Sequence, residues 1–310
     1  MAELFDRAIT HGGQVTPAAG MDRRPLILAG AVALAASLYA WAIFVASFAH
    51  DGVIGPHYNA PGSDWMVFHG AAQAFLHGDL ALTADPVRFT AYLNEQYGWW
   101  LSSPLPFHPW LYPPTFLLVL LPFCWLPFLA SYTLFQLVSF SALAAAAWGL
   151  ASRKAIIPLL LLLSPAAAAT VIVGQNAFLT AALALGGLRL LPNAPVLAGV
   201  LFGLLTIKPQ FGLLIAVALC AGRHWRVMSA ASATAALLAL ASLLIFGWQP
   251  WADWFAFFLS PDPLIHREWM DWSRMWGLSV FTCARLAGFP DHLATAAQLI
   301  AIVACGMKLM

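Results

Sequence analysis

The chain has 310 residues, of which 62% are hydrophobic and only 9% are charged, and its formal net charge is +1. A soluble domain carries roughly 25% charged residues, so this composition excludes a water-soluble globular protein. The near-zero charge gives no sign of a nucleic-acid partner. The apolar runs reach or approach the ~20 residues that cross a bilayer, which predicts an all-α polytopic membrane protein.

The N-terminal part is predicted to be a cytoplasmic tail followed by a membrane span. Residues 1–24 are polar and end in Arg23-Arg24, and positive charge marks the cytoplasmic side of a span. The apolar run that follows, 25–49, is too long for the core of a signal peptide. We therefore expect it to be retained as the first transmembrane helix.

Residues 50–112 form a polar outer loop, which is too long to be a simple connector. Within it, Ser63 is the expected cap of a helix whose apolar residues fall on one stripe. Asp85-Pro86 has the residue order of a second helix start, with an acidic cap and a proline at the first helical position. We expect two helices lying on the membrane surface.

From Tyr112 onward, apolar segments alternate with short polar connections. Segment 113–129 contains Pro122 and Pro127, and although two full spans over 113–151 are the simpler count, we expect it to be re-entrant or a broken half-span. Only then do all the basic clusters between the later segments face the cytoplasm. The whole chain, 1–310, is then one transmembrane domain of about 9–10 membrane segments, truncated within the last one. These segments are 113–129, 131–151, 155–173, 177–191, 194–207, 210–222, 227–247, 275–290 and 292–310, with an outer loop at 249–274.

Neither a metal site nor a nucleotide site is indicated. The histidines show no HxH or HExxH arrangement, and there is no P-loop and no GxGxxG motif. The cysteines lack CxxC spacing and are interpreted as small core residues; they are Cys124, Cys220, Cys283 and Cys305. We expect no cofactor.

Asp64 is the first candidate for chemistry, because it lies near the start of the first outer helix. One interpretation is structural, since an acid in the first turn stabilises the helix dipole. The other is functional: the carboxylate would act as a general base at the membrane surface or would orient a substrate hydroxyl.

Among the single residues, Lys208 is the strongest candidate for a functional role, because it follows a short apolar segment and precedes Pro209. A cation at such a depth is expensive and is usually functional. Its natural partner is a lipid phosphate, which would also meet the free amides at the next helix start, near Gln210. The alternative is a lysine that extends to the outer headgroups.

Five further residues are candidates for substrate contacts or catalysis, each with a structural alternative. Gln175 and Asn176 can bind sugar hydroxyls or a phosphate oxygen, or they can join helices by hydrogen bonds. Tyr112 precedes two prolines that rigidify the start of a membrane segment, and its ring could face a ligand. In the tryptophan-rich loop 249–274, His266 is a possible second base and Arg274 a possible phosphate contact, or both are solvated charges beside an aromatic belt.

Taken in order, Asp64, Tyr112-Pro113-Pro114, Gly174-Gln175-Asn176 and Lys208-Pro209 resemble glycosyltransferase family 87. This is the polyprenol-phosphate-mannose-dependent mannosyltransferase-like family, whose fold is the membrane-embedded GT-C bundle. The resemblance implies transfer of a hexose, with mannose as the first candidate, from a polyprenyl-phosphate carrier to a lipid or glycan acceptor. The reaction would take place on the outer face of the inner (cell) membrane, with inversion and without a metal.

By the same resemblance, Asp64 would lie at the acceptor hydroxyl and Lys208 would neutralise the departing lipid phosphate. Two other classes of function stay open from the residues alone. In a transporter or lipid-carrier flippase, Lys208 would be the counter-charge of the substrate, and sealed vesicles would show transport without a glycosyl product. A truncated, non-catalytic relative would insert normally but would bind no donor lipid.

Overall fold

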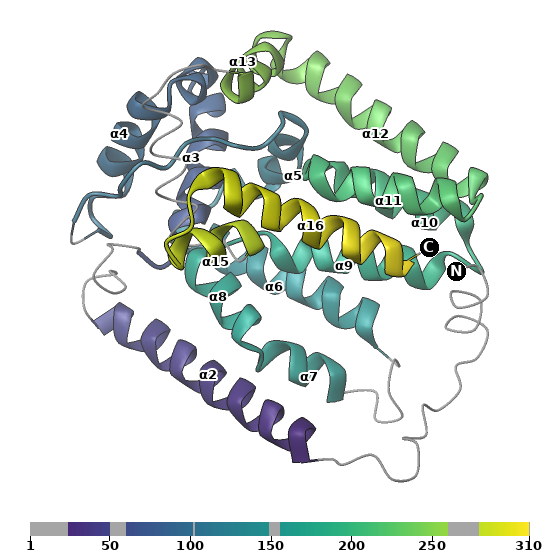
Figure 1. The fold of residues 1–310 in the computed structure, drawn as a ribbon. Coiled ribbons are helices and arrows are strands. Elements are labelled where there is room, and N and C mark those ends of the chain that lie inside the picture. Colours follow the sequence, from purple (N-terminus) through teal and green to yellow (C-terminus); the bar gives the residue numbers. More distant parts are fainter. Residues whose placement is uncertain (1–23, 50–59, 102, 149–155, 260–278, 310) are drawn as a thin grey trace. The chain divides into compact units, whose positions relative to one another are not determined.

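The computed structural model describes residues 24–49, 60–101, 103–148, 156–259 and 279–309 (Figure 1). The described residues form helices and connecting loops, and no strand occurs among them. The chain divides into two compact units, residues 16–255 and residues 1–15 with 256–310. The helices are α2 (Arg24–Ala49), α3 (Ser63–Leu76), η1 (Leu80–Ala84), α4 (Pro86–Tyr97), α5 (Thr115–Cys124), α6 (Phe128–Ala147), α7 (Ile156–Leu162), α8 (Pro165–Val173), α9 (Ala177–Leu190), α10 (Pro195–Leu204), η2 (Leu205–Ile207), α11 (Pro209–Ala221), α12 (Trp225–Phe246), α13 (Gln249–Leu259), α15 (Val280–Leu286) and α16 (Asp291–Leu309).

Two helices, α6 and α12, are each long and apolar enough to cross a membrane. A third crossing results if α7 and α8 act as one span, since the pair is apolar but bent by 55°. The bend has a local cause: Ser164 caps α8 by accepting a hydrogen bond from the Ala167 amide, and Pro165 occupies the first helical position. The described residues therefore confirm a helical membrane protein.

Helices α6 and α9 lie side by side and run in the same direction (Figure 1). From the middle of α6, the Gln136 side chain donates to the carbonyl of Gln175 just before α9 begins. In the last turn of α9, Arg189 donates hydrogen bonds to the carbonyls of Ala146 and Trp148 at the end of α6. The bent α7–α8 pair lies between α6 and α9 in the chain and leads back to the start of α9. Gln175 and Arg189 thus lie at opposite ends of the bundle, which agrees with the charge pattern of the sequence.

Helix α10 packs closely on α12 because glycines line the contact. A Cβ atom on Gly199 would lie 2.5 Å from the Val227 carbonyl oxygen, and one on Gly203 would lie 2.6 Å from that of Ala231. The spacing of four residues places both glycines on one face of the helix. The backbones can therefore approach as in other membrane helix pairs that use small residues.

The predicted outer helices exist, but α3 differs from its prediction. Instead of a single apolar stripe, ten of its residues are buried, including Trp65, Phe68 and Gly70. A Cβ atom on Gly70 would lie 2.4 Å from a methyl group of Leu93, so α4 approaches α3 closely. Ser63 is not the cap either: Gly62, with φ +78°, precedes the helix, and no side chain caps it. Asp85 and Pro86 do begin α4 as predicted.

Helix α5 is a short helix within the predicted segment 113–129. Its ten residues extend only about 15 Å, half of the ~30 Å hydrocarbon core. The connection that follows it returns to α3, since the carbonyls of Leu126 and Cys124 accept hydrogen bonds from the side chains of His69 and Gln73. Both ends of α5 therefore lie near α3.

Two smaller predictions were wrong in part. Cys124 is buried, but Cys220 and Cys283 are exposed, and none of the three is in a disulfide. In a membrane protein an apolar segment can face lipid, so an apolar neighbourhood does not imply a core position. The predicted loop 249–274 also begins with a helix, because α13 occupies Gln249–Leu259.

Candidate active site

The side chain of Gln175 is the centre of a polar cluster at one end of the bundle. Its Nε2 atom donates a hydrogen bond of 2.7 Å to Oδ2 of Asp64. Its Oε1 atom accepts from the Tyr112 hydroxyl at 2.9 Å, and Nζ of Lys208 lies 3.5 Å away, at the outer limit of a hydrogen bond. Four residues that are far apart in the sequence thus meet at one amide group.

The main chain holds Asp64 and Gln175 together at two glycines. Gly174 ends α8 with φ +75°, and the virtual Cβ position of this residue lies 2.6 Å from Cβ of Trp65. Gly62 also has a positive φ, and its amide donates a 2.7 Å hydrogen bond to the Ile172 carbonyl. The start of α3 therefore lies directly against the turn that carries Gln175.

Asp64 is held by one of its two carboxylate oxygens. The Gln175 amide occupies Oδ2, whereas Oδ1 makes no hydrogen bond with a described residue. The side chain is partly accessible. Burial raises the pKa of Asp64 to about 6, against the opposing effects of the Lys208 charge and the Gln175 hydrogen bond. A carboxylate with such a pKa and a free oxygen can accept a proton near neutral pH.

Lys208 lies in the connection between η2 and α11, where it precedes Pro209. Its ammonium group is 5.7 Å from the centre of the Tyr112 ring, within the range of a cation–π contact. Burial lowers the pKa of Lys208 to about 8, although the charge of Asp64 opposes this effect. No direct ion pair joins the two charged groups, because the amide of Gln175 lies between them.

Tyr112 forms the aromatic wall of the cluster. Its ring packs against Phe68 and Phe116, with ring centres 5.0 Å and 4.6 Å apart. The preceding residue, Leu111, is fixed from another element, since the indole of Trp254 in α13 donates to its carbonyl at 3.1 Å. Burial raises the pKa of the Tyr112 hydroxyl, so this group stays protonated and acts as a hydrogen-bond donor.

The remaining predicted site residues are distributed differently. Asn176 is completely buried beside Gln175, and its side-chain amide makes no hydrogen bond of good geometry with a described residue. Gln210 is exposed near the start of α11 and makes no hydrogen bond with a described residue. His266 and Arg274 lie outside the described residues.

The sequence analysis did not identify the residues that support this cluster from α6. Gln136 donates a hydrogen bond of 3.1 Å to the main-chain carbonyl of Gln175, and the Tyr132 hydroxyl donates to the carbonyl of Val171. Ser131 accepts from the indole of Trp65 in α3 at 3.2 Å. One sequence signal was available: within the apolar run Phe128–Ala147, the sole amide side chain is Gln136.

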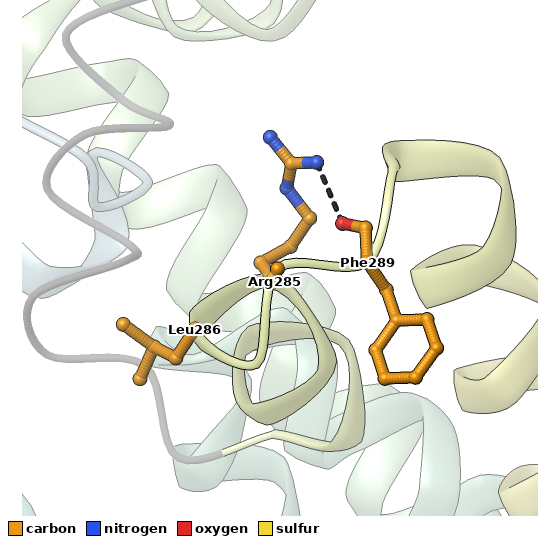
Figure 2. Close-up of a pocket in the computed structure, with 4 residues that line it drawn as sticks. Arg285, Leu286 and Phe289 are labelled. Atoms are coloured by element: carbon orange, nitrogen blue, oxygen red, sulfur yellow. Dashed lines mark hydrogen bonds between the residues drawn. The ribbon is translucent and has the colours of Figure 1, made fainter.

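A surface hollow occurs in the other compact unit. It is lined by Arg285, Leu286, Gly288 and Phe289, in the turn between α15 and α16 (Figure 2). The Arg285 guanidinium donates to the Phe289 carbonyl at 2.9 Å and lies 2.7 Å from the Asp291 carboxylate. These contacts close the helix turn, so we assign Arg285 a structural role.

The close approach at Gly174 can be tested directly. In Gly174→Ala the new methyl group would meet Trp65, and we expect a loss of about 2–5 kcal/mol from overpacking and left-handed backbone strain. Gly78→Ala is the matched control, because its φ is +79° and no atom lies within 4 Å of the added group. Thermal unfolding of the purified proteins should show a small loss for Gly78→Ala and a clearly larger one for Gly174→Ala. Equal losses would contradict the packing described here.

The chain is thus a helical membrane protein in which an acid, a lysine and a shared amide form one polar cluster. A family model for glycosyltransferase family 87 matches residues 110–310, and the chain belongs to this family. It is therefore a glycosyltransferase. No curated protein and no solved structure matches the chain. Tyr112, Gln175 and Lys208 lie within the matched region, whereas α3 with Asp64 precedes it.

Proposed function

We propose that this glycosyltransferase moves a hexose, with mannose as the first candidate, from a polyprenyl-phosphate carrier to an acceptor hydroxyl. The acceptor is a lipid or a glycan, and the site opens to the outer face of the cell membrane. The observation that carries the proposal is the single amide of Gln175, which joins the Asp64 carboxylate to the Lys208 ammonium group. The site thus holds a proton acceptor and a cation without letting them neutralise each other.

The two charged groups match the two needs of the reaction. Oδ1 of Asp64 accepts the proton of the acceptor hydroxyl as the hydroxyl oxygen bonds to the anomeric carbon. The bond from that carbon to the phosphate oxygen breaks, and the oxygen leaves with the electron pair. Lys208 stabilises the resulting phosphate charge. A single displacement of this kind inverts the anomeric centre, and no step in it requires a metal.

A transport function fits the cluster less well. A flippase would need a counter-charge such as Lys208, but it would not need a carboxylate with a raised pKa and a free oxygen. A non-catalytic relative would not need either group. The close assembly of Asp64, Gln175 and Lys208 therefore favours the transferase.

The proposal is tested by reconstituting the full chain in vesicles that contain polyprenyl-phosphate-mannose or polyprenyl-phosphate-glucose, with extracted membrane lipids and glycans as acceptors. We expect a glycosylated product with the anomeric configuration opposite to that of the donor. Nucleotide-sugar donors should give none. Movement of the donor lipid across the bilayer without any product would overturn the proposal in favour of a flippase.

The raised pKa of Asp64 predicts the acid limb of the pH profile. Below about pH 6 the carboxyl is protonated and cannot accept a proton, so kcat/KM should fall about tenfold per pH unit. Above about pH 8 the loss of the Lys208 charge should lower it again. The donor is a phosphodiester and does not titrate in this range. Rates measured from pH 4.5 to 9 should give a bell-shaped curve, and an acid limb near pH 4 would contradict the assignment of Asp64.

A further inference from the structure

Gln136 is an unusual residue for its position in the chain. It lies within α6, which is one of two helices in the described part of the chain that are long and apolar enough to span a membrane, and it is only 6% exposed. A polar side chain at such a site carries a desolvation cost and usually has a specific purpose. Its Oε1 atom has no hydrogen bond to a described residue, so the amide is not present to satisfy the polar atoms of α6 itself.

The contact that Gln136 does make is to the centre of the site. Its Nε2 atom donates to the main-chain carbonyl of Gln175, in the turn between α8 and α9. One turn earlier on α6, the Tyr132 hydroxyl donates to the Val171 carbonyl at the end of α8. Helix α6 therefore fixes this turn on both sides of Gly174, where the backbone changes direction.

The position of the Gln175 side chain depends on this main chain. The amide reaches Asp64 with one atom and Tyr112 and Lys208 with the other, so a shift of the backbone would alter all three contacts together. A misplacement of 1 Å by a change remote from the reacting atoms can lower a rate about 10²-fold.

We infer that Gln136 is a positioning residue for the transfer reaction, because it holds the main chain of Gln175 and thereby sets the amide between Asp64 and Lys208. The inference rests on the proposed function. Gln136 touches neither of the two charged groups in the structure, and it acts through Gln175.

The test compares Gln136→Met with Ser139→Ala in the full chain. Methionine has nearly the same length but cannot donate a hydrogen bond. Ser139 is the matched control, since it is buried one turn further along α6 and its hydroxyl bonds only to the carbonyls of Phe135 and Gln136 in the same helix. Both variants remove one buried polar group. Of these two groups, only the Gln136 amide contacts the turn that carries Gln175.

In kinetic assays we expect kcat of Gln136→Met to fall about tenfold to 10²-fold while KM stays within about threefold. The acid limb of kcat/KM should also move to higher pH, because the Gln175 hydrogen bond lowers the pKa of Asp64 and would be weakened. A merely structural loss would reduce the amount of folded protein without moving this limb. An unchanged limb together with an unchanged kcat would overturn the inference.

A second readout does not need activity. The amides of Gln175 and Asn176 donate within the turn, to the Thr170 carbonyl and to Oε1 of Gln175. Hydrogen exchange in the peptide that covers residues 170–180 should be faster in Gln136→Met and unchanged in Ser139→Ala. Equal exchange in both would overturn the inference, whereas faster exchange in a protein that transfers no hexose would show that Gln136 holds the turn and would count against the proposed function.

Discussion

Asp64→Asn is expected to lower the transfer rate by about 10²–10⁴-fold, the usual contribution of a general base. Asparagine keeps the shape of the side chain, and its oxygen can still accept the Gln175 hydrogen bond, but it cannot accept a proton. The rate of product formation from a polyprenyl-phosphate-hexose is the measurement. The residual activity should lack the acid limb near pH 6.

The thermal stability of Asp64→Asn should stay the same or rise, although its activity falls. The folded-state pKa of Asp64 is raised above its ordinary value of 3.8, so any stabilising effect of the carboxyl is present below pH 3.8 and is lost as the pH rises through about 6. At pH 7 Asp64→Asn removes a buried charge. We expect an unchanged or higher Tm together with the loss of activity, which is the usual conflict between stability and function in active sites.

Asp85→Asn is the control that separates catalysis from a helix-start role. Asp85 caps α4 by accepting hydrogen bonds from the amides of Val87 and Arg88, and asparagine is an equally good cap. If Asp64 only stabilised a helix start, the two substitutions would have similarly small effects. Full transfer activity in Asp64→Asn would remove the central role proposed for this residue.

Lys208→Met is expected to lower kcat/KM by about 10²–10³-fold, because the departing phosphate would lose its cation in a largely desolvated site. Methionine fills similar space, so the packing around Tyr112 should survive. Lys208→Arg should recover part of the activity, since it keeps the charge but changes the geometry. The assay is the same transfer reaction, measured with saturating acceptor.

Arg226→Met is the control for a general effect of charge. Arg226 is exposed in the first turn of α12, beyond the far end of α11 from Lys208. Its loss changes the net charge by the same amount and should leave the rate within about threefold of the wild type, as is usual for surface changes. Comparable losses in Lys208→Met and Arg226→Met would show that the lysine has no specific role in the reaction.

Much of the helix arrangement could be predicted from the sequence, because long apolar runs and their flanking charges have few solutions in a bilayer. The predicted segment 177–191 corresponds to α9, and the predicted start of α4 at Asp85-Pro86 is confirmed. Segment 113–129 contains the short α5, and Pro127 directly precedes α6. In each case the signal is local, since it lies in the length of a run, a proline or a capping residue.

Features that depend on which face of a helix is buried could not be predicted. An apolar side chain is equally suited to lipid and to a protein core, so the apolar pattern of α3 did not reveal that this helix is enclosed by its neighbours. The same ambiguity led to the wrong assignment of Cys220 and Cys283. Gln136 was missed for another reason, because its role depends on a contact with a residue 39 positions further along the chain.

The distance along the chain between Asp64 and Gln175 has a consequence for how the protein is made. The two residues are 111 positions apart, so at 5–20 residues per second roughly 5–20 seconds of synthesis separate them. During this interval α3 has left the ribosome, but the turn against which its first residues pack does not yet exist. The aromatic residues of α3 can already pack against α5 and α6, which are made earlier, through the contacts of Trp65 with Phe135 and of Phe68 with Phe116. The carboxylate of Asp64 gains its amide partner only when Gln175 has been made, so assembly of the site is a late step in biogenesis.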